Sequence, residues 1–266
     1  MTGRKIKMQR LNELIPNIPP INTALSYADF LQMKADTYNA TQGSLKGFDC
    51  PICKNKGYIE KIVNEDEVLA RCKCLKTRDT LRRIHDSGME ELLRRCTFKN
   101  FECTEKWQET LKNAAQKFAE QDSGSFFIGG QSGCGKTHLC TAIVGTMIKR
   151  GRSARYFVWR EMSVILKGAV NDQEYTQMMD DFKKTDVLYI DDLFKQNNIN
   201  DADIKLAFEL IDYRVRTNRM TVISTEMDLN RILDIDEALG GRIIQAARGN
   251  KYIIAKDRGK NYRLKE

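Results

Sequence analysis

Residues 126–140 read "FFIGGQSGCGKTHLC", and this stretch decides the fold. Within it, residues 130–137 match the pattern G-x-x-x-x-G-K-[ST] without a break. An apolar run precedes the match and a stretch with helical character follows it. Glycines let such a loop fold tightly, so that consecutive backbone N–H groups and the positive end of the next helix face phosphate oxygens. The pattern therefore predicts a P-loop that binds a nucleoside triphosphate.

The roles within the loop follow from this geometry. Lys136 is predicted to reach the β- and γ-phosphates as a catalytic residue, and the Thr137 hydroxyl to bind Mg²⁺. The expected ATP-binding residues of this segment are Gly130, Gln131, Ser132, Gly133, Cys134, Gly135, Lys136, Thr137 and His138.

Two carboxylates follow a second apolar run, "VLYIDDLF", at residues 187–194. A P-loop hydrolase needs a carboxylate at the end of a neighbouring strand to hold its metal. Asp191 is predicted to hold Mg²⁺ through water, and Asp192 to polarise the attacking water as a second catalytic acid. The alternative for Asp192 is a helix cap or another structural hydrogen bond.

A third strand pattern, "MTVISTEMD" at residues 220–228, also ends in polar residues. Thr225 and Glu226 are the expected sensors beside the γ-phosphate, although an ordinary strand terminus has a similar composition. Short apolar strands are expected at 125–130, 154–159, 187–190, 220–225 and 251–255, with helices between them. This alternation predicts an α/β fold with a mostly parallel sheet covered on both faces.

Four of the eight cysteines are clustered, as a C-x₂-C and a C-x-C eighteen residues apart. Thiolates at two short turns suit tetrahedral Zn²⁺, and the intervening "GYIEKI" and "EVLARC" are typical of a hairpin. Such a closed site would be structural and would let a small module fold. The predicted zinc ligands are Cys50, Cys53, Cys72 and Cys74, with a reduced, metal-free cluster as the alternative.

The chain is predicted to have two domains, a small zinc-binding domain at 1–97 and an ATPase domain at 98–266. Three of the four prolines lie within residues 1–22, which favours an extended lead-in there. Residues 23–40 have the apolar spacing of one amphipathic helix.

Charge and composition limit the classes of partner that the chain can have. The chain has 44 Lys and Arg against 36 Asp and Glu, and residues 242–265 hold eight basic residues against the single acid Asp257. A basic tract suits nucleic acid or nucleotide phosphate, and a solvated surface is the alternative. No apolar run approaches the roughly 18 residues of a membrane helix, and the first residues lack the apolar core of a signal peptide. A cytoplasmic protein without membrane association is expected.

Six segments in order, over residues 95–266, carry a family resemblance: "FKNF", "FFIGGQSGCGKTHL", "VLYIDDL", "MTVISTEMD", "LGGRII" and "GKNYRL". The set resembles AAA+ ATPases of the DnaC/DnaI helicase-loader type, to which IstB-type transposition helpers are closely related. The resemblance implies a five-stranded AAA+ core with ATP between neighbouring subunits. It makes Arg242 the catalytic arginine finger and Arg263 an ATP-binding sensor arginine. Glu226 departs from the family, which usually has Asn there.

The implied function is loading of a hexameric replicative helicase onto single-stranded DNA during replication. The subunits would assemble in a helical or ring-like row, with the N-terminal zinc domain gripping the helicase. An IstB-like DNA-binding ATPase that assists transposition is the main alternative. A metabolic P-loop kinase is a further alternative, but it would need a basic lid, which is not evident between the motifs. A nucleotide switch that does not hydrolyse ATP is another alternative, and Glu226 and Asp192 are the residues that suggest it.

Overall fold

The computed structural model describes residues 26–47, 49–86, 89–170, 172–195 and 198–264. The chain divides into two compact units, residues 1–72 and 73–266. Helices α3 (Cys74–Asp86) and α4 (Glu90–Arg95) fall in the second unit, where both contact α6. The structural division therefore lies earlier in the chain than residue 97, and where a partner-binding domain ends stays a prediction. The expected extended lead-in at 1–22 lies outside the described residues.

Among the described residues of the first unit, 26–47 and 49–72, there are one helix and one hairpin. Helix α2 (Tyr27–Ala40) begins after Ser26, whose hydroxyl accepts the Asp29 N–H while the Asp29 carboxylate accepts the Ser26 N–H. Strands β1 (Tyr58–Val63) and β2 (Asp66–Arg71) pair antiparallel, as the sequence predicts. Their two-residue turn, Asn64–Glu65, has positive φ at both positions, the geometry that matches strand twist in tight hairpins.

The second unit is built on a five-stranded sheet in the order β4-β5-β6-β3-β7, and every neighbouring pair is parallel. The predicted parallel sheet is confirmed. Its strands are β3 (Ser125–Gly130), β4 (Ala154–Val158), β5 (Val187–Asp191), β6 (Met220–Ser224) and β7 (Lys251–Ile254).

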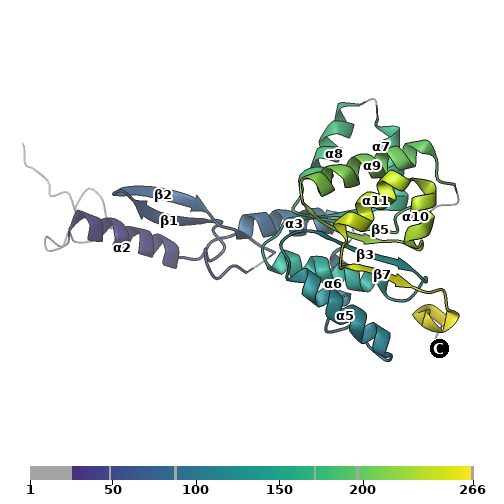
Figure 1. Cartoon of the computed structure of the whole chain (residues 1–266). Coiled ribbons are helices and arrows are strands. Elements are labelled where there is room, and N and C mark those ends of the chain that lie inside the picture. The colour runs from purple at the N-terminus through teal and green to yellow at the C-terminus, as the bar shows by residue number, and fades with distance from the viewer. Residues whose placement is uncertain (1–25, 48, 87–88, 171, 196–197, 265–266) are drawn as a thin grey trace, which may run out of the picture. The chain divides into compact units, whose positions relative to one another are not determined.

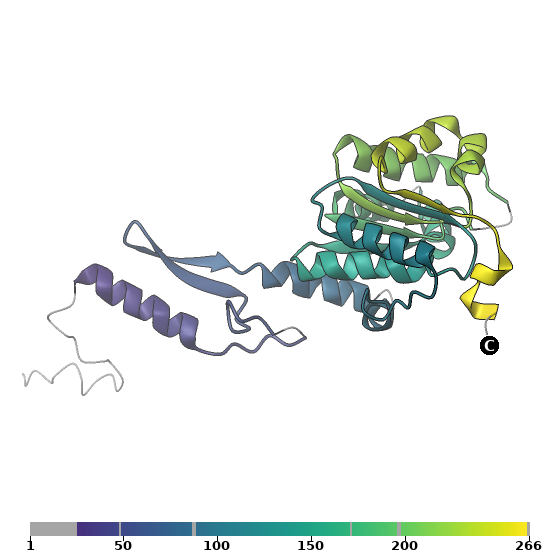
Figure 2. The ribbon, with the colours of Figure 1, turned by 60° about the horizontal axis from the view of Figure 1, so that its bottom comes forward.

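Helices cover both faces of this sheet (Figures 1 and 2). One face packs on α5 (Lys106–Ala119) and α6 (Lys136–Lys149). The other carries α7 (Trp159–Gly168), α8 (Gln173–Lys184), α9 (Asp201–Arg216), α10 (Leu229–Ile235) and α11 (Glu237–Ala246). Two short 3-10 helices, η1 (Arg258–Lys260) and η2 (Tyr262–Leu264), follow β7.

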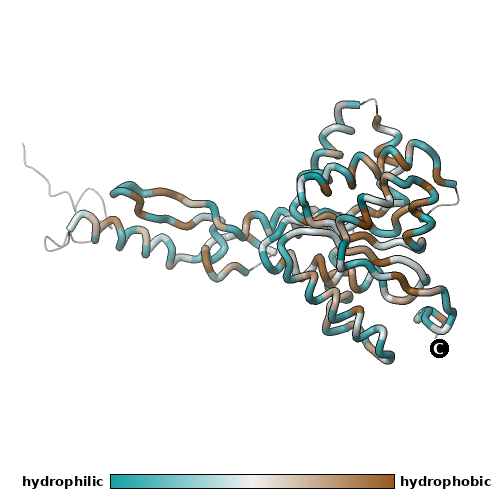
Figure 3. Tube along the Cα trace, viewed as in Figure 1, coloured by the Kyte–Doolittle hydropathy of each residue, from teal (hydrophilic) through white to brown (hydrophobic). Residues whose placement is uncertain are grey.

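Alternating side chains of each strand supply two hydrophobic cores. Val187 and Tyr189 of β5 join the core under α5 and α6, whereas Leu188 and Ile190 join the core under α7 to α11. Because successive side chains of a strand point to opposite faces, an uninterrupted apolar run is what a sheet covered on both sides requires. Figure 3 shows brown, hydrophobic segments along these strands.

Within the described residues, no helix combines the length and hydrophobicity needed to cross a bilayer.

Candidate functional site

The P-loop connects the carboxyl end of β3 to the first turn of α6, and its shape requires glycine. Gly130, Gly133 and Gly135 have φ values of 101°, 70° and 94°. A Cβ on Gly130 would lie 2.0 Å from the carbonyl oxygen of Ile254, so β7 leaves no room for a side chain there. The backbone can therefore turn its N–H groups toward a phosphate at the helix N-terminus.

Lys136 is buried and folds back over the loop. Its Nζ donates to the carbonyl oxygens of Gly130, at 3.0 Å, and Gln131, at 2.6 Å. Cys134 is also buried, and its Sγ lies 2.9 Å from the same Gln131 oxygen. The ammonium is thus held over the space that the loop encloses, where Lys136 is predicted to meet phosphate.

An open cleft of about 400 Å³ lies beside the loop. Most of the predicted site lines it, namely residues 132–138 together with Asp192, Glu226 and Arg263. Gly130, Gln131 and Thr225 instead line a neighbouring depression, whose walls also include Ser132 and Glu226. Five further residues that the sequence analysis did not name also line this cleft, which is called the nucleotide cleft below because the predicted P-loop lines it: Asn100, Phe101, Glu102, Lys195 and Tyr262.

Asp191 is buried at the end of β5 and lies next to the loop. The Thr137 hydroxyl donates to Asp191 Oδ1 at 3.3 Å, so the two predicted Mg²⁺ ligands are brought together. Tyr156 of β4 donates to Oδ2 and Tyr189 of β5 to Oδ1, each at 2.7 Å, and the Ser224 hydroxyl of β6 also donates to Oδ1. Three adjacent strands therefore orient this one carboxylate.

Asp192 turns the chain out of β5 with a φ of +56°. Its N–H donates to Ser224 Oγ at 3.1 Å, and its carboxylate accepts from Lys195 Nζ at 3.0 Å. Burial raises the pKa of Asp192, and the negative charges of Asp191 and Glu226 raise it further against the opposing hydrogen bond from Lys195. A carboxylate with a raised pKa at the cleft wall is suited to accept a proton from water.

The two predicted sensor residues have different surroundings. Thr225 is fully buried, and its hydroxyl donates to the Leu193 carbonyl and accepts the Met227 N–H. Glu226 reaches the cleft and pairs with Lys195 at 3.0 Å. Burial would raise the pKa of Glu226, but hydrogen bonds from Lys195 and Ser132 bring it below its ordinary value. Of the pair, only Glu226 presents its side chain to the nucleotide cleft.

The segment "FKNF" and the C-terminal turn approach the loop from outside the sheet. The Phe101 ring packs edge-on against His138 with centroids 5.2 Å apart, and His138 Nε2 lies 2.9 Å from the Thr97 carbonyl oxygen. On the other side, the Tyr262 N–H donates to the Gly133 carbonyl at 2.9 Å. "FKNF" entered the sequence analysis only for the family resemblance, and its aromatic residues were the available signal for packing against the loop.

Arg242 lies on α11 and is not among the residues that line the nucleotide cleft. Its guanidinium donates to Asp212 of α9 and stacks over the Phe208 ring, with Cζ 4.5 Å from the centroid. The Arg242 hydrogen bond, together with Arg216, lowers the pKa of Asp212. Arg242 thus lies at a surface of α9 and α11, held in a defined orientation.

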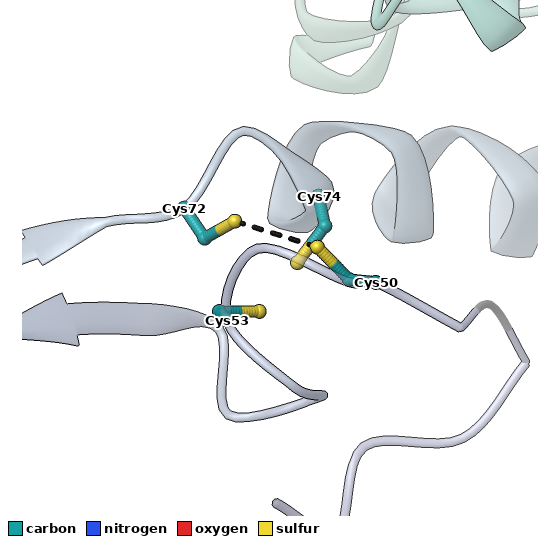
Figure 4. A group of neighbouring side chains, drawn as sticks. All are labelled: Cys50, Cys53, Cys72 and Cys74. Carbon is teal, nitrogen blue, oxygen red and sulfur yellow. Dashed lines mark hydrogen bonds between the residues drawn. The ribbon is translucent and has the colours of Figure 1, made fainter. Parts of the chain in front are cut away.

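The four predicted zinc ligands meet in one cluster (Figure 4). Cys50, Cys53, Cys72 and Cys74 are buried and carry no disulfide, and their sulfur atoms all lie within 4.8 Å of one another. The Cys50 and Cys72 sulfurs are 3.7 Å apart. A tetrahedral site with Zn–S bonds of about 2.3 Å has sulfur–sulfur edges of about 3.8 Å, so the cluster fits a metal of this size.

Comparison with known proteins places this geometry in a family. The family model for IstB-like ATP binding protein matches residues 57–250. The uncharacterized protein YqaM of Bacillus subtilis is 30% identical over 272 aligned positions, covering 82% of this chain and 86% of YqaM. The replicative helicase loader DnaC of Escherichia coli K12 is 24% identical over 63% of this chain and 69% of its own length.

Solved structures agree on the fold. The crystal structure of DnaI superimposes with a TM-score of 0.53 at 23% identity, covering 62% of this chain and 92% of DnaI. The DnaC helicase loader gives a TM-score of 0.51 at 19% identity. The predicted resemblance is confirmed: the chain belongs to the family of IstB-like ATP-binding proteins and is an ATPase with an AAA+ fold, homologous to the DnaC/DnaI helicase loaders.

Proposed function

We propose that this replication-related ATPase loads a hexameric replicative helicase onto single-stranded DNA, and that ATP is hydrolysed between neighbouring subunits. One observation carries the proposal. The P-loop, Asp192 and Glu226 line one cleft at the carboxyl ends of β3, β5 and β6, and Asp191 is hydrogen-bonded to Thr137 of the same cleft. They do so in a chain that matches curated replicative helicase loaders over about two thirds of its length or more.

Within the cleft, the loop N–H groups and Lys136 bind the phosphates of ATP, with Arg263 contacting the nucleotide from the C-terminal turn. Thr137 and Asp191 hold Mg²⁺, since their oxygens are adjacent and Asp191 is already oriented by three hydroxyl donors. Bound Mg²⁺ would neutralise charge on the β- and γ-phosphates. Asp192 accepts a proton from the attacking water, in keeping with its raised pKa.

Arg242 acts on the neighbouring subunit. Its absence from the cleft of its own subunit and its fixed orientation against Asp212 and Phe208 favour a role in trans. A planar guanidinium offers several donors to the charge that develops on a transferring phosphoryl group. Completion of each site by the next subunit couples hydrolysis to assembly in a row.

The cysteine cluster holds structural Zn²⁺. Four buried thiol sulfurs at tetrahedral spacing leave no open coordination position, so the metal would stabilise the fold of the N-terminal segment. The Gly57 N–H donates to Cys53 Sγ at 3.3 Å, the kind of outer contact that orients a metal ligand. We propose that this segment contacts the helicase and that the basic residues of 242–265 other than Arg242 and Arg263 contribute to DNA binding.

The test uses the full-length protein with the hexameric replicative helicase of its own cell. Capture of the helicase by the tagged chain with ATP, and stimulation of ATP hydrolysis by single-stranded DNA, are the expected results. Lys136→Ala is expected to abolish nucleotide binding. A zinc-loaded, folded chain that fails to capture the helicase would refute the loader function.

The family match gives a second candidate, an ATPase that assists a transposase on DNA. Such a protein would share the AAA+ cleft and DNA-stimulated hydrolysis. Retention of a transposase in the same capture experiment, with no helicase, would favour this candidate over the loader.

A further inference from the structure

Lys195 lies in the turn after β5, and its side chain contacts one residue that follows β5 and one that follows β6. Its Nζ is 3.0 Å from Asp192 Oδ2 and 3.0 Å from Glu226 Oε1. Burial would lower the pKa of Lys195, but its hydrogen bonds to both carboxylates raise it, so the ammonium stays charged. One cation is thus shared by Asp192 and Glu226, two of the three acids that line the nucleotide cleft.

The shared position lies at the wall of the cleft beside the P-loop. Lys195 and Glu226 line both the nucleotide cleft and the neighbouring depression, and Ser132 of the loop lines both as well. Ser132 also hydrogen-bonds Glu226. The Lys195 side chain is about one third exposed, at 36%, and its stem is flexible.

Glu226 by itself would repel a triphosphate. A carboxylate and a phosphate a few ångströms apart at a partly buried wall interact with several kcal/mol at an effective dielectric constant of about 20. The observed pairing with Lys195 opposes this repulsion. The pair also holds a second ammonium, besides Lys136, at the wall of the same cleft.

We propose that Lys195 is a γ-phosphate ligand, and that Glu226 holds its ammonium in place. This inference rests on the proposed ATP site. In the structure the ammonium bonds Asp192 and Glu226; with ATP it donates a hydrogen bond to a γ-phosphate oxygen in place of the Asp192 carboxylate and keeps its bond to Glu226. ADP offers no oxygen at that position, so Asp192 stays paired. Discrimination between ATP and ADP is the expected consequence.

The test measures dissociation constants by calorimetry for ADP and a non-hydrolysable ATP analogue, both with Mg²⁺. Lys195→Met is expected to weaken analogue binding about tenfold while changing ADP binding less than about twofold, because it removes a cation and leaves Glu226 uncompensated. Adding Glu226→Gln to this variant is expected to recover about threefold of the loss, since the repelling charge is then gone.

A matched pair controls for loss of any lysine–glutamate bridge. Lys183 of α8 pairs with Glu209 of α9 at 2.6 Å, and neither residue lines the nucleotide cleft. Lys183→Met is expected to leave the ratio of analogue to ADP affinity unchanged. Thermal unfolding midpoints of all variants show whether each is folded.

Two failures are distinguishable. A wild-type chain that binds neither nucleotide would contradict the proposed ATP site itself. A wild-type chain that binds both, with a folded Lys195→Met variant that weakens both equally or neither, would refute the role of Lys195 and leave the site standing.

Discussion

Asp191 shows how much of the site depends on residues distant in sequence. Its carboxylate accepts from Tyr156 at 2.7 Å, and Tyr156 belongs to the neighbouring strand β4. A hydrogen bond to a charged group contributes about 1.5–3 kcal/mol, so its loss should allow the carboxylate to rotate away from Thr137. Tyr156→Phe is expected to lower the turnover number about tenfold and to raise the Mg²⁺ concentration needed for half-maximal hydrolysis.

The measurement is steady-state hydrolysis over a Mg²⁺ titration. Tyr252→Phe is the matched control, because the Tyr252 hydroxyl lies 3.4 Å from the Gly249 carbonyl, and Tyr252 does not line the cleft. An unchanged Mg²⁺ dependence in Tyr156→Phe would argue against Asp191 as a metal ligand.

At the residue scale, the motifs that the sequence predicts are those with local spacing. Lys136, Thr137, Asp191 and Asp192 follow from short patterns, and the structure places them around one loop. The contacts of Tyr156 with Asp191 and of Lys195 with Glu226 could not be predicted in this way, because only pairing of β4, β5 and β6 brings these residues together. The contact between Lys195 and Glu226 depends on the order of strands in the sheet, and the hydrophobic pattern of a sequence does not give that order.

At the scale of elements, the P-loop and the C-terminal turn form one packed unit. Gly133 has a φ of +70°, and a Cβ added to it would lie 1.8 Å from Asn261 Oδ1. Gly133→Ala is therefore expected to displace the turn that carries Arg263 and to weaken ATP binding more than tenfold. Gly151→Ala, with a φ of +81° and open space around its Cβ, is the control and should cost only about 1 kcal/mol of stability. Equal nucleotide affinity of the two variants would exclude the packing role.

The proposed metal at the cysteine cluster would hold the hairpin and the turns beside it together. Cys53→Ser is expected to abolish zinc binding and to make residues 26–72 sensitive to proteolysis, while ATP binding by the second unit persists. Zinc content by atomic absorption and limited proteolysis measure this. Cys103→Ser is the control, because Cys103 lies outside the cluster. Full zinc content in a folded Cys53→Ser variant would refute the predicted ligand set.

The elements themselves were largely predictable, because each strand is a short apolar run whose successive side chains pack alternately into one core and the other. The strands at 125–130 and 251–254 agree with expectation to within one residue, and Trp159 begins α7 instead of ending β4. Helix α10 was not expected, since its seven residues are too few to show a helical period. Nor did the pattern show that α3 and α4 pack with the second unit, which depends on long-range contacts.

At the scale of the whole molecule, the proposed site is complete only in an assembly. Arg242→Ala and Lys136→Ala are each expected to abolish DNA-stimulated hydrolysis, the first by removing the donor to the neighbour and the second by removing nucleotide binding. Mixing the two inactive proteins in equal amounts should restore about a quarter of wild-type activity, the share of interfaces that join an intact cleft to an intact arginine. Arg216→Ala, which removes the other arginine bonded to Asp212, should stay active. If the mixture stays inactive although the subunits co-assemble, Arg242 does not act across the interface.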